Sequence, residues 1–219
     1  GYSMSPEQQQ LAKTLVERAR AMVPTIKARA AEAAAQGQVH KETVQEMQDA
    51  GFFRVLQSSR FGGYELDPQV FFDIQMTLAE GDMSVAWIYG VIAVHNWQLA
   101  LFDDQAAKDV WKDRTDVLIS STYMPVGKVE HVEGGFKLSG RWGFSSGSEH
   151  CDWMFLGAIV PPKEGAPMGP PDMRTFLLPR ADYKIVENWD VIGLRATGSN
   201  DVVVEGAFVP EYRTHKAGD

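Results

Sequence analysis

Apolar residues recur at helical spacing through the first half of the chain and in short, strand-like runs through the second half. Ser5, Pro6 and Gln8 form a capping-box pattern with a proline at the first helical position, so a helix is predicted from there to Gly37. Pro24 lies inside it and is a candidate kink. Four further helices are predicted, at residues 41–50, after residue 68, from about residue 84, and at residues 104–111.

The helix that begins near residue 84 is apolar on nearly all sides. His95, Asn96 and Gln98 interrupt its apolar run, which is shorter than the roughly 20 residues that cross a bilayer. We therefore expect no membrane span here. The pattern predicts a buried helix in the middle of a helical layer.

The pattern changes near residue 116, after which it is typical of strands. Gly134 and Gly135 predict a hairpin, and the Pro- and Gly-rich residues 161–171 predict a long surface loop. The predicted strands cover residues 117–122, 127–132, 136–144, 153–160, 175–178, 184–187 and 202–209.

Helices followed by antiparallel strands indicate an α+β fold. We predict an all-helical N-terminal domain over residues 1–115 and a β-barrel or sandwich domain over residues 116–219. A crevice between two such layers is a common ligand site.

Composition narrows the class of protein further. A hydrophobic content of 44% supplies a substantial core, and the net charge of −8 comes without any basic run that would track nucleic acid. The single cysteine, Cys151, excludes an intrachain disulfide and a multi-cysteine metal site, and it fits a reducing compartment. The N-terminus lacks the pattern of a secretory signal, so we expect a cytoplasmic protein. We also expect no metal site, because His131 and His150 lack ligand partners at metal spacing.

His95 is the first candidate for chemistry. It lies in helical steps from Val91 and Leu99 on an apolar stripe, so it is expected to be buried. A buried histidine often has a hydrogen-bond partner and no further role. It is also well suited to act as a general base near neutral pH. The residue pattern leaves both interpretations open.

Three polar segments at strand ends or in loops are further candidates. Residues 120–122 are three consecutive hydroxyl residues, which suit either a ligand or a solvated strand end. Residues 142–147 read Trp-Gly-Phe-Ser-Ser-Gly, where glycines allow close approach of a planar ring; the alternative is a bulge with a packed Trp142. Residues 194–200 offer a guanidinium, two hydroxyls and an amide for a phosphate or a partner subunit. Dinucleotide-binding, nucleophile-elbow and zinc-protease motifs do not occur.

Taken together, five segments in this order resemble the two-component, reduced-flavin-dependent aromatic monooxygenases, whose oxygenase components have an acyl-CoA-dehydrogenase-like fold. They are RFGGY at 60–64, VHNWQLALF at 94–102, SST at 120–122, WGFSSG at 142–147 and GLRATGS at 193–199. The resemblance covers nearly the whole chain. The most similar types are the oxygenases of a seco-steroid phenol, of 4-hydroxyphenylacetate and of indole or indole-3-acetate.

The resemblance implies an N-terminal helical domain, a middle β domain and a C-terminal four-helix bundle, of which the sequence contains the first two. It implies reduced flavin, FMNH2 or FADH2, and O2 as cofactors, acting through a C4a-hydroperoxyflavin to hydroxylate a small phenol or indole in catabolism. A separate NAD(P)H-flavin reductase supplies the reduced flavin. The bundle holds part of the flavin site and most contacts of a homotetramer.

By position, the resemblance assigns His95 to the substrate hydroxyl, Ser121 to the substrate and flavin, and Ser146 to flavin N5. It assigns the remaining cofactor contacts to Ser120, Trp142, Phe144, Ser145, Gly147, Thr197 and Ser199. Two alternatives stay open. One is a true acyl-CoA dehydrogenase, which shares the fold. The other is that this chain is a non-catalytic fragment that binds flavin or serves in assembly.

Overall fold

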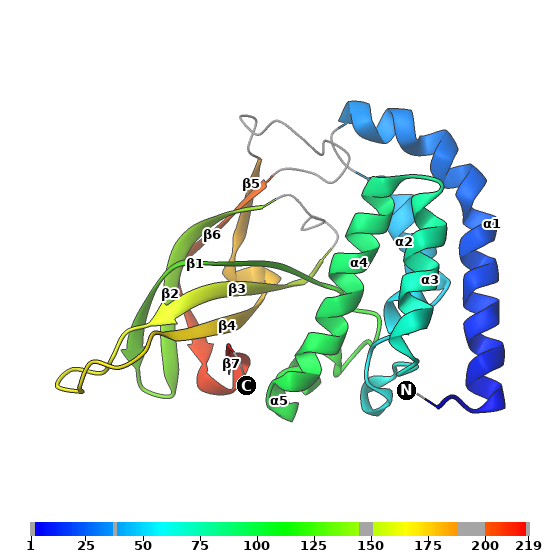
Figure 1. Ribbon diagram of the computed structural model, residues 1–219. Helices are drawn as coiled ribbons and strands as arrows, with labels where there is room; N and C mark the ends of the chain where they lie inside the picture. The colour runs from blue at the N-terminus through cyan, green and yellow to red at the C-terminus, as the bar shows by residue number, and fades with distance from the viewer. Residues whose placement is uncertain (1–2, 37–38, 145–150, 188–199, 218–219) are drawn as a thin grey trace.

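The computed structural model describes residues 3–36, 39–144, 151–187 and 200–217, in which helices precede strands (Figure 1). The helices are α1 Pro6–Gln36, α2 Lys41–Asp49, α3 Pro68–Ala79, α4 Met83–Gln98 and α5 Asp104–Trp111. The strands are β1 Ile119–Val132, β2 Gly135–Phe144, β3 Trp153–Val160, β4 Asp172–Pro179, β5 Lys184–Glu187, β6 Asn200–Pro210 and β7 Thr214–Lys216. Short 3-10 turns include η1 Phe52–Arg54 and η6 Glu211–Arg213.

Side-chain caps explain where the helices begin. The predicted capping box is present, since the Gln8 backbone N–H donates to Ser5 Oγ at 3.1 Å and the Ser5 N–H donates to Gln8 Oε1 at 2.9 Å. Pro24 lies inside α1 without ending it. Three later helices begin at an aspartate whose carboxylate accepts the N–H two residues on, at 2.8 Å in each case: Asp67, Asp82 and Asp103.

The strands form one seven-stranded sheet in the order β5-β6-β2-β1-β3-β4-β7. The predicted hairpin joins β1 and β2, and residues 161–171 form an exposed loop as predicted. The expectation of antiparallel strands throughout was wrong at one pairing, because β1 and β3 run parallel. The two strands predicted at 117–122 and 127–132 are a single strand, β1. Its last five residues, 128–132, pair with β2, whereas Ile119 to Thr122 and Gly127 pair with β3.

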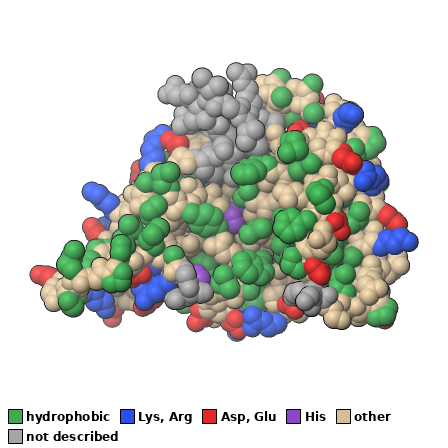
Figure 2. Space-filling model, in the orientation of Figure 1, with side chains coloured by type: hydrophobic (Ala, Val, Ile, Leu, Met, Phe, Trp, Pro, Cys, Tyr) green, Lys and Arg blue, Asp and Glu red, His purple; other side chains and the backbone are tan. Residues whose placement is uncertain are grey.

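The helices stack in the order α1, α3, α4, and α4 lies against the sheet at β1 (Figure 1). One apolar core fills the helical layer, a second fills the sheet around Trp142, and a third joins the layers through Leu99, Phe102, Ile119 and Phe155. The expectation that α4 lies in the middle of the helical layer was only partly correct. Trp87 and Trp97 are each 51% exposed, because α4 has more apolar surface than its described neighbours cover (Figure 2).

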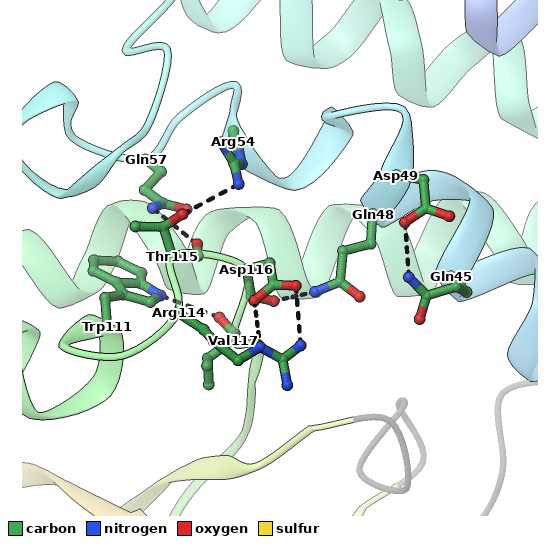
Figure 3. A network of polar contacts seen from close by, with 10 residues as sticks. All are labelled: Gln45, Gln48, Asp49, Arg54, Gln57, Trp111, Arg114, Thr115, Asp116 and Val117. Atoms are coloured by element: carbon green, nitrogen blue, oxygen red, sulfur yellow. Dashed lines mark hydrogen bonds and ion pairs between the residues drawn. The ribbon is translucent and has the colours of Figure 1, made fainter.

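The segment between the layers is fixed by side chains from the helical part (Figure 3). The backbone carbonyl of Thr115 accepts from Gln57 Nε2 at 3.2 Å, and its hydroxyl accepts from Arg54 Nη2 at 3.1 Å. Gln48 Nε2 donates to the carbonyl of Asp116. Trp111 Nε1 donates to the carbonyl of Val117 at 3.1 Å. The boundary predicted at 115/116 lies in this segment, and the independence of two domains stays a prediction.

A second set of polar contacts joins α5 to the end of the sheet. Asp109 on α5 accepts a hydrogen bond from the Tyr212 hydroxyl at 2.5 Å and one from Arg213 Nε at 3.0 Å. The Arg213 guanidinium also lies over the Trp153 ring, 5.1 Å from its centroid. Within the described ranges, no helix is long and apolar enough to cross a membrane.

Candidate active site

His95 lies in the last turn of α4, where the helix meets β1 and β3. Its side chain is 2% exposed, as predicted, and its Nδ1 lies 2.7 Å from the backbone oxygen of Ile119. A carbonyl oxygen can only accept, so Nδ1 carries the proton of the neutral ring. The other ring nitrogen, Nε2, therefore has a lone pair that can accept a proton or a hydrogen bond.

Burial keeps His95 neutral. It lowers the pKa of the imidazole from 6.5 to about 4, while the hydrogen bond to the Ile119 backbone acts in the opposite direction. Among the described residues, no carboxylate contributes to this shift. At neutral pH the side chain is therefore a base without charge, which is the state a proton acceptor needs.

The shifted pKa of His95 makes stability depend on pH. Between pH 6.5 and pH 4 the unfolded chain binds a proton at His95 that the folded chain does not, so stability falls as the pH falls. We expect this group to contribute a loss of roughly 2 kcal/mol in unfolding free energy between pH 7 and pH 5. Urea unfolding at the two pH values measures it. The His95→Asn variant should lack this part of the slope, and an equal slope in the variant would contradict the assignment.

Aromatic rings surround the imidazole. The Phe155 ring from β3 lies 5.7 Å from it at 83°, and the Tyr123 ring from β1 lies 6.1 Å from it at 69°. Phe155 is fully buried and stacks on Phe102 with ring centroids 5.3 Å apart. This apolar enclosure accounts for the low pKa of the histidine and restricts the access of water to it.

The strand register decides which of the three hydroxyl residues faces His95. Neighbouring residues in paired strands share a face, and successive residues alternate. Ser121 lies opposite Phe155, so it is on the His95 side of the sheet. Ser120 lies opposite Met154, a residue of the sheet core, so it points to the other face. Both serines are buried. The structure thus brings Ser121 to the histidine's side of the sheet and turns Ser120 away.

Tyr123 and Gln98 belong to this site although the residue pattern did not single them out. The Tyr123 hydroxyl donates to Gln98 Oε1 at 2.5 Å, and it also hydrogen-bonds Ser121. Gln98 follows His95 by three residues on α4, so both side chains lie on one face of the helix. That spacing was a signal in the sequence. The partner on β1 was not visible without the fold.

Trp142 lies in the core of the sheet. It is fully buried, and its Nε1 donates to the backbone oxygen of Gly157 at 2.9 Å. This position matches the packed-tryptophan alternative, so any contact with a cofactor would come from the backbone of this segment. Phe144 ends β2 opposite Asn200. The remaining predicted contacts, Ser145, Ser146, Gly147, Thr197 and Ser199, lie outside the described residues and stay predictions.

The polar groups around His95 suit a planar organic ring. In the part of the chain that the structure describes, no group of three His, Cys, Asp or Glu side chains could hold a metal ion. Hydroxyls and an amide lie beside a neutral imidazole and buried aromatic rings, a combination that fits a ring with a polar edge. Other apolar side chains of α4 are exposed on the surface of the protein (Figure 2).

Comparison with known proteins gives consistent results. Residues 5–114 match the family model described as acyl-CoA dehydrogenase, N-terminal domain. The chain is 44% identical over 198 residues to the flavin-dependent monooxygenase, oxygenase subunit HsaA, of Rhodococcus jostii (strain RHA1), covering 90% of this chain and 51% of that protein. It is 31% identical to the p-hydroxyphenylacetate 3-hydroxylase oxygenase component of Acinetobacter baumannii, covering 94% and 48%.

A solved structure agrees with the fold. The crystal structure of 3-HSA hydroxylase from Rhodococcus sp. RHA1 superposes with a TM-score of 0.87 at 43% identity, covering 93% of this chain and 51% of that one. The chain spans about half the length of the curated relatives it matches.

Proposed function

The chain belongs to the family of the acyl-CoA dehydrogenase N-terminal domain, and on that basis we propose that it is part of the oxygenase component of a two-component flavin-dependent monooxygenase. The reaction is hydroxylation of a small aromatic ring, a phenol or an indole. The observation that carries the proposal is a neutral, buried His95 whose Nε2 can accept a proton beside a strand of hydroxyl residues. The names of the relatives at 44% and 31% identity support it.

The cofactors and partners follow from this assignment. Reduced flavin together with O2 supplies the electrophilic oxygen atom that is added to the ring. A separate reductase that uses NAD(P)H delivers the reduced flavin, which places the reaction in the cytoplasm, where that reductant is available. The full-length protein assembles as a homotetramer. One relative is named an FADH2-dependent resorcinol hydroxylase, which favours FADH2 over FMNH2 as the flavin.

His95 acts on the substrate hydroxyl. The phenol donates its hydrogen bond to Nε2, and the proton moves to that nitrogen as negative charge develops on the phenol oxygen. Burial disfavours an isolated imidazolium, so transfer is favoured only while the phenolate lies next to it. The increased electron density on the ring promotes attack at the neighbouring carbon. The Nδ1 hydrogen bond to Ile119 holds the ring in the tautomer that this step requires.

Ser121 and the aromatic enclosure have supporting tasks. Ser121 lies on the His95 face of β1, where its hydroxyl orients the ring edge of substrate or flavin. Phe155 and Phe102 keep water from the reacting centre. An indole substrate has no phenol proton to give. With such a substrate His95 orients the ring and does not deprotonate it.

An assay with the full-length protein tests the function. Chemically reduced FAD is mixed with oxygenated buffer, protein and a panel of phenols and indoles, and products are analysed by mass spectrometry. We expect product that has gained one oxygen atom, with the oxygen label following 18O2. Flavin bleaching by an acyl-CoA under anaerobic conditions, without oxygen insertion, would instead support the dehydrogenase. Binding of neither flavin nor aromatics would support a non-catalytic fragment.

A further inference from the structure

We propose that Tyr123 is a specificity-determining residue, whose ring is the wall that limits the size of substituents beside the substrate hydroxyl at His95. This inference rests on the proposed function and assigns a substrate-selecting role within the same site. It follows from three features of the described residues: an interruption in β1, an anchor on the Tyr123 hydroxyl, and a difference between the two rings that contact His95.

Tyr123 follows Ser121 by two residues, so it lies on the same face of β1, toward α4, and it begins an interruption of strand pairing. Thr122 pairs with Leu156, but the next pair is Gly127 with Ala158, so four residues of β1 lie opposite a single residue of β3. Gly157 is the single β3 residue opposite these four residues, and a Cβ added to it would lie 2.1 Å from the backbone oxygen of Tyr123. The absence of a side chain at Gly157 therefore allows β1 to follow this path.

Two hydrogen bonds fix the Tyr123 ring. The hydroxyl donates to Gln98 Oε1 at 2.5 Å, and Ser121 hydrogen-bonds the same oxygen. Burial of the hydroxyl end raises the pKa of Tyr123 to about 12, so the phenol remains a donor at neutral pH. Gln98 lies on the same helix as His95, and Ser121 lies on the same strand as Tyr123. The ring is therefore tied to both elements that form the site.

The two rings beside His95, those of Phe155 and Tyr123, differ in how strongly the surrounding structure holds them in place. Phe155 is fully buried and packed on Phe102, so displacing it disturbs the core that joins the layers. Tyr123 is 42% exposed and is anchored through its hydroxyl. We place the ortho substituent of a phenol bound at His95 against Tyr123, because this ring lies 6.1 Å from the imidazole and is the less buried of the two. The size of that wall decides which phenols fit.

The test compares two substrates in the full-length protein with reduced FAD and O2. Phenol and 2-phenylphenol differ in the ortho substituent and both keep one free ortho carbon. The measured quantity is the ratio of kcat/KM for 2-phenylphenol to kcat/KM for phenol. In Tyr123→Ala we expect this ratio to rise by about tenfold or more, because a pocket gains room for an apolar group. Tyr123→Phe keeps the ring but loses the anchor, so its ratio should lie between wild type and Tyr123→Ala.

The matched control is Tyr212→Ala, which also removes a partly exposed tyrosine whose hydroxyl donates to a side-chain oxygen, here at Asp109. Its ratio should equal that of wild type. A ratio in Tyr123→Ala within twofold of wild type overturns the inference. Dissociation constants of the two phenols, measured by tryptophan fluorescence, give the same ratio without turnover. If the wild-type protein binds phenols but inserts no oxygen, the proposed function is contradicted. The ratio of the dissociation constants then still tests whether Tyr123 selects substrates by size.

Discussion

Replacement of His95 by asparagine is expected to lower kcat for phenol hydroxylation by about 10²–10⁴-fold, the usual contribution of a general base. Asparagine retains an N–H that can donate to the Ile119 oxygen, so the backbone contact that positions α4 against β1 is preserved. The lone pair of Nε2 is lost. Steady-state turnover with reduced FAD, O2 and phenol measures the effect, and substrate binding measured separately shows whether KM changes alone.

His131→Asn is the matched control for this variant. His131 also contacts a backbone carbonyl, that of Pro161 at 2.6 Å, but it is exposed and lies on the far half of β1. Its replacement should leave turnover unchanged. If His95→Asn retains more than a third of wild-type kcat for a phenol, the histidine has only a structural role. An indole substrate should show a smaller loss, because no phenol proton is transferred.

Replacement of Trp142 by alanine is expected to lower the free energy of unfolding by about 3–5 kcal/mol, as for other fully buried large aromatic residues. The ring lies between Gly127 and Gly140, where an added Cβ would come within 2.6 Å and 2.8 Å of it, so these two neighbours have no side chains that could move into the cavity. The variant also removes the donor to the Gly157 oxygen. Urea unfolding measures the change.

Trp87→Ala provides the comparison, because that tryptophan is half exposed on α4 and its loss should cost less than about 1 kcal/mol. The two variants also separate the interpretations of Trp142. A loss of flavin affinity at unchanged stability would show that the ring contacts the cofactor and is not a core residue. A large loss of stability would show the reverse.

Local signals in the sequence were sufficient for much of the fold. The capping box at Ser5 fixed the start of α1, and Gly134 and Gly135 marked the hairpin. Burial of His95 followed from the helical period, because residues three and four apart share a face. These features depend on neighbours within a few residues.

Features that join distant segments were not predictable from such patterns. The parallel pairing of β1 with β3 depends on how the β1–β2 hairpin leaves half of β1 free, which no local pattern records. Tyr123 shares the strand face of Ser121, but which face of β1 meets His95 depends on the packing of α4 against the sheet. The sequence also did not show which of Ser120 and Ser121 faces His95, because that depends on the pairing of β1 with β3. The sequence also left open whether His95 is a base or a structural residue, and the His95→Asn experiment decides that.

The polar contacts on the segment between α5 and β1 have a consequence for ligand binding. His95 lies on α4 and Ser121 lies on β1, and this segment sets the position of the helix relative to the strand. Side chains of Gln48, Arg54 and Gln57 hold it at two successive residues (Figure 3). The two halves of the site are therefore preorganised before any ligand arrives. Little of the binding free energy is then lost in ordering the protein, and more remains for holding substrate and flavin in reactive geometry.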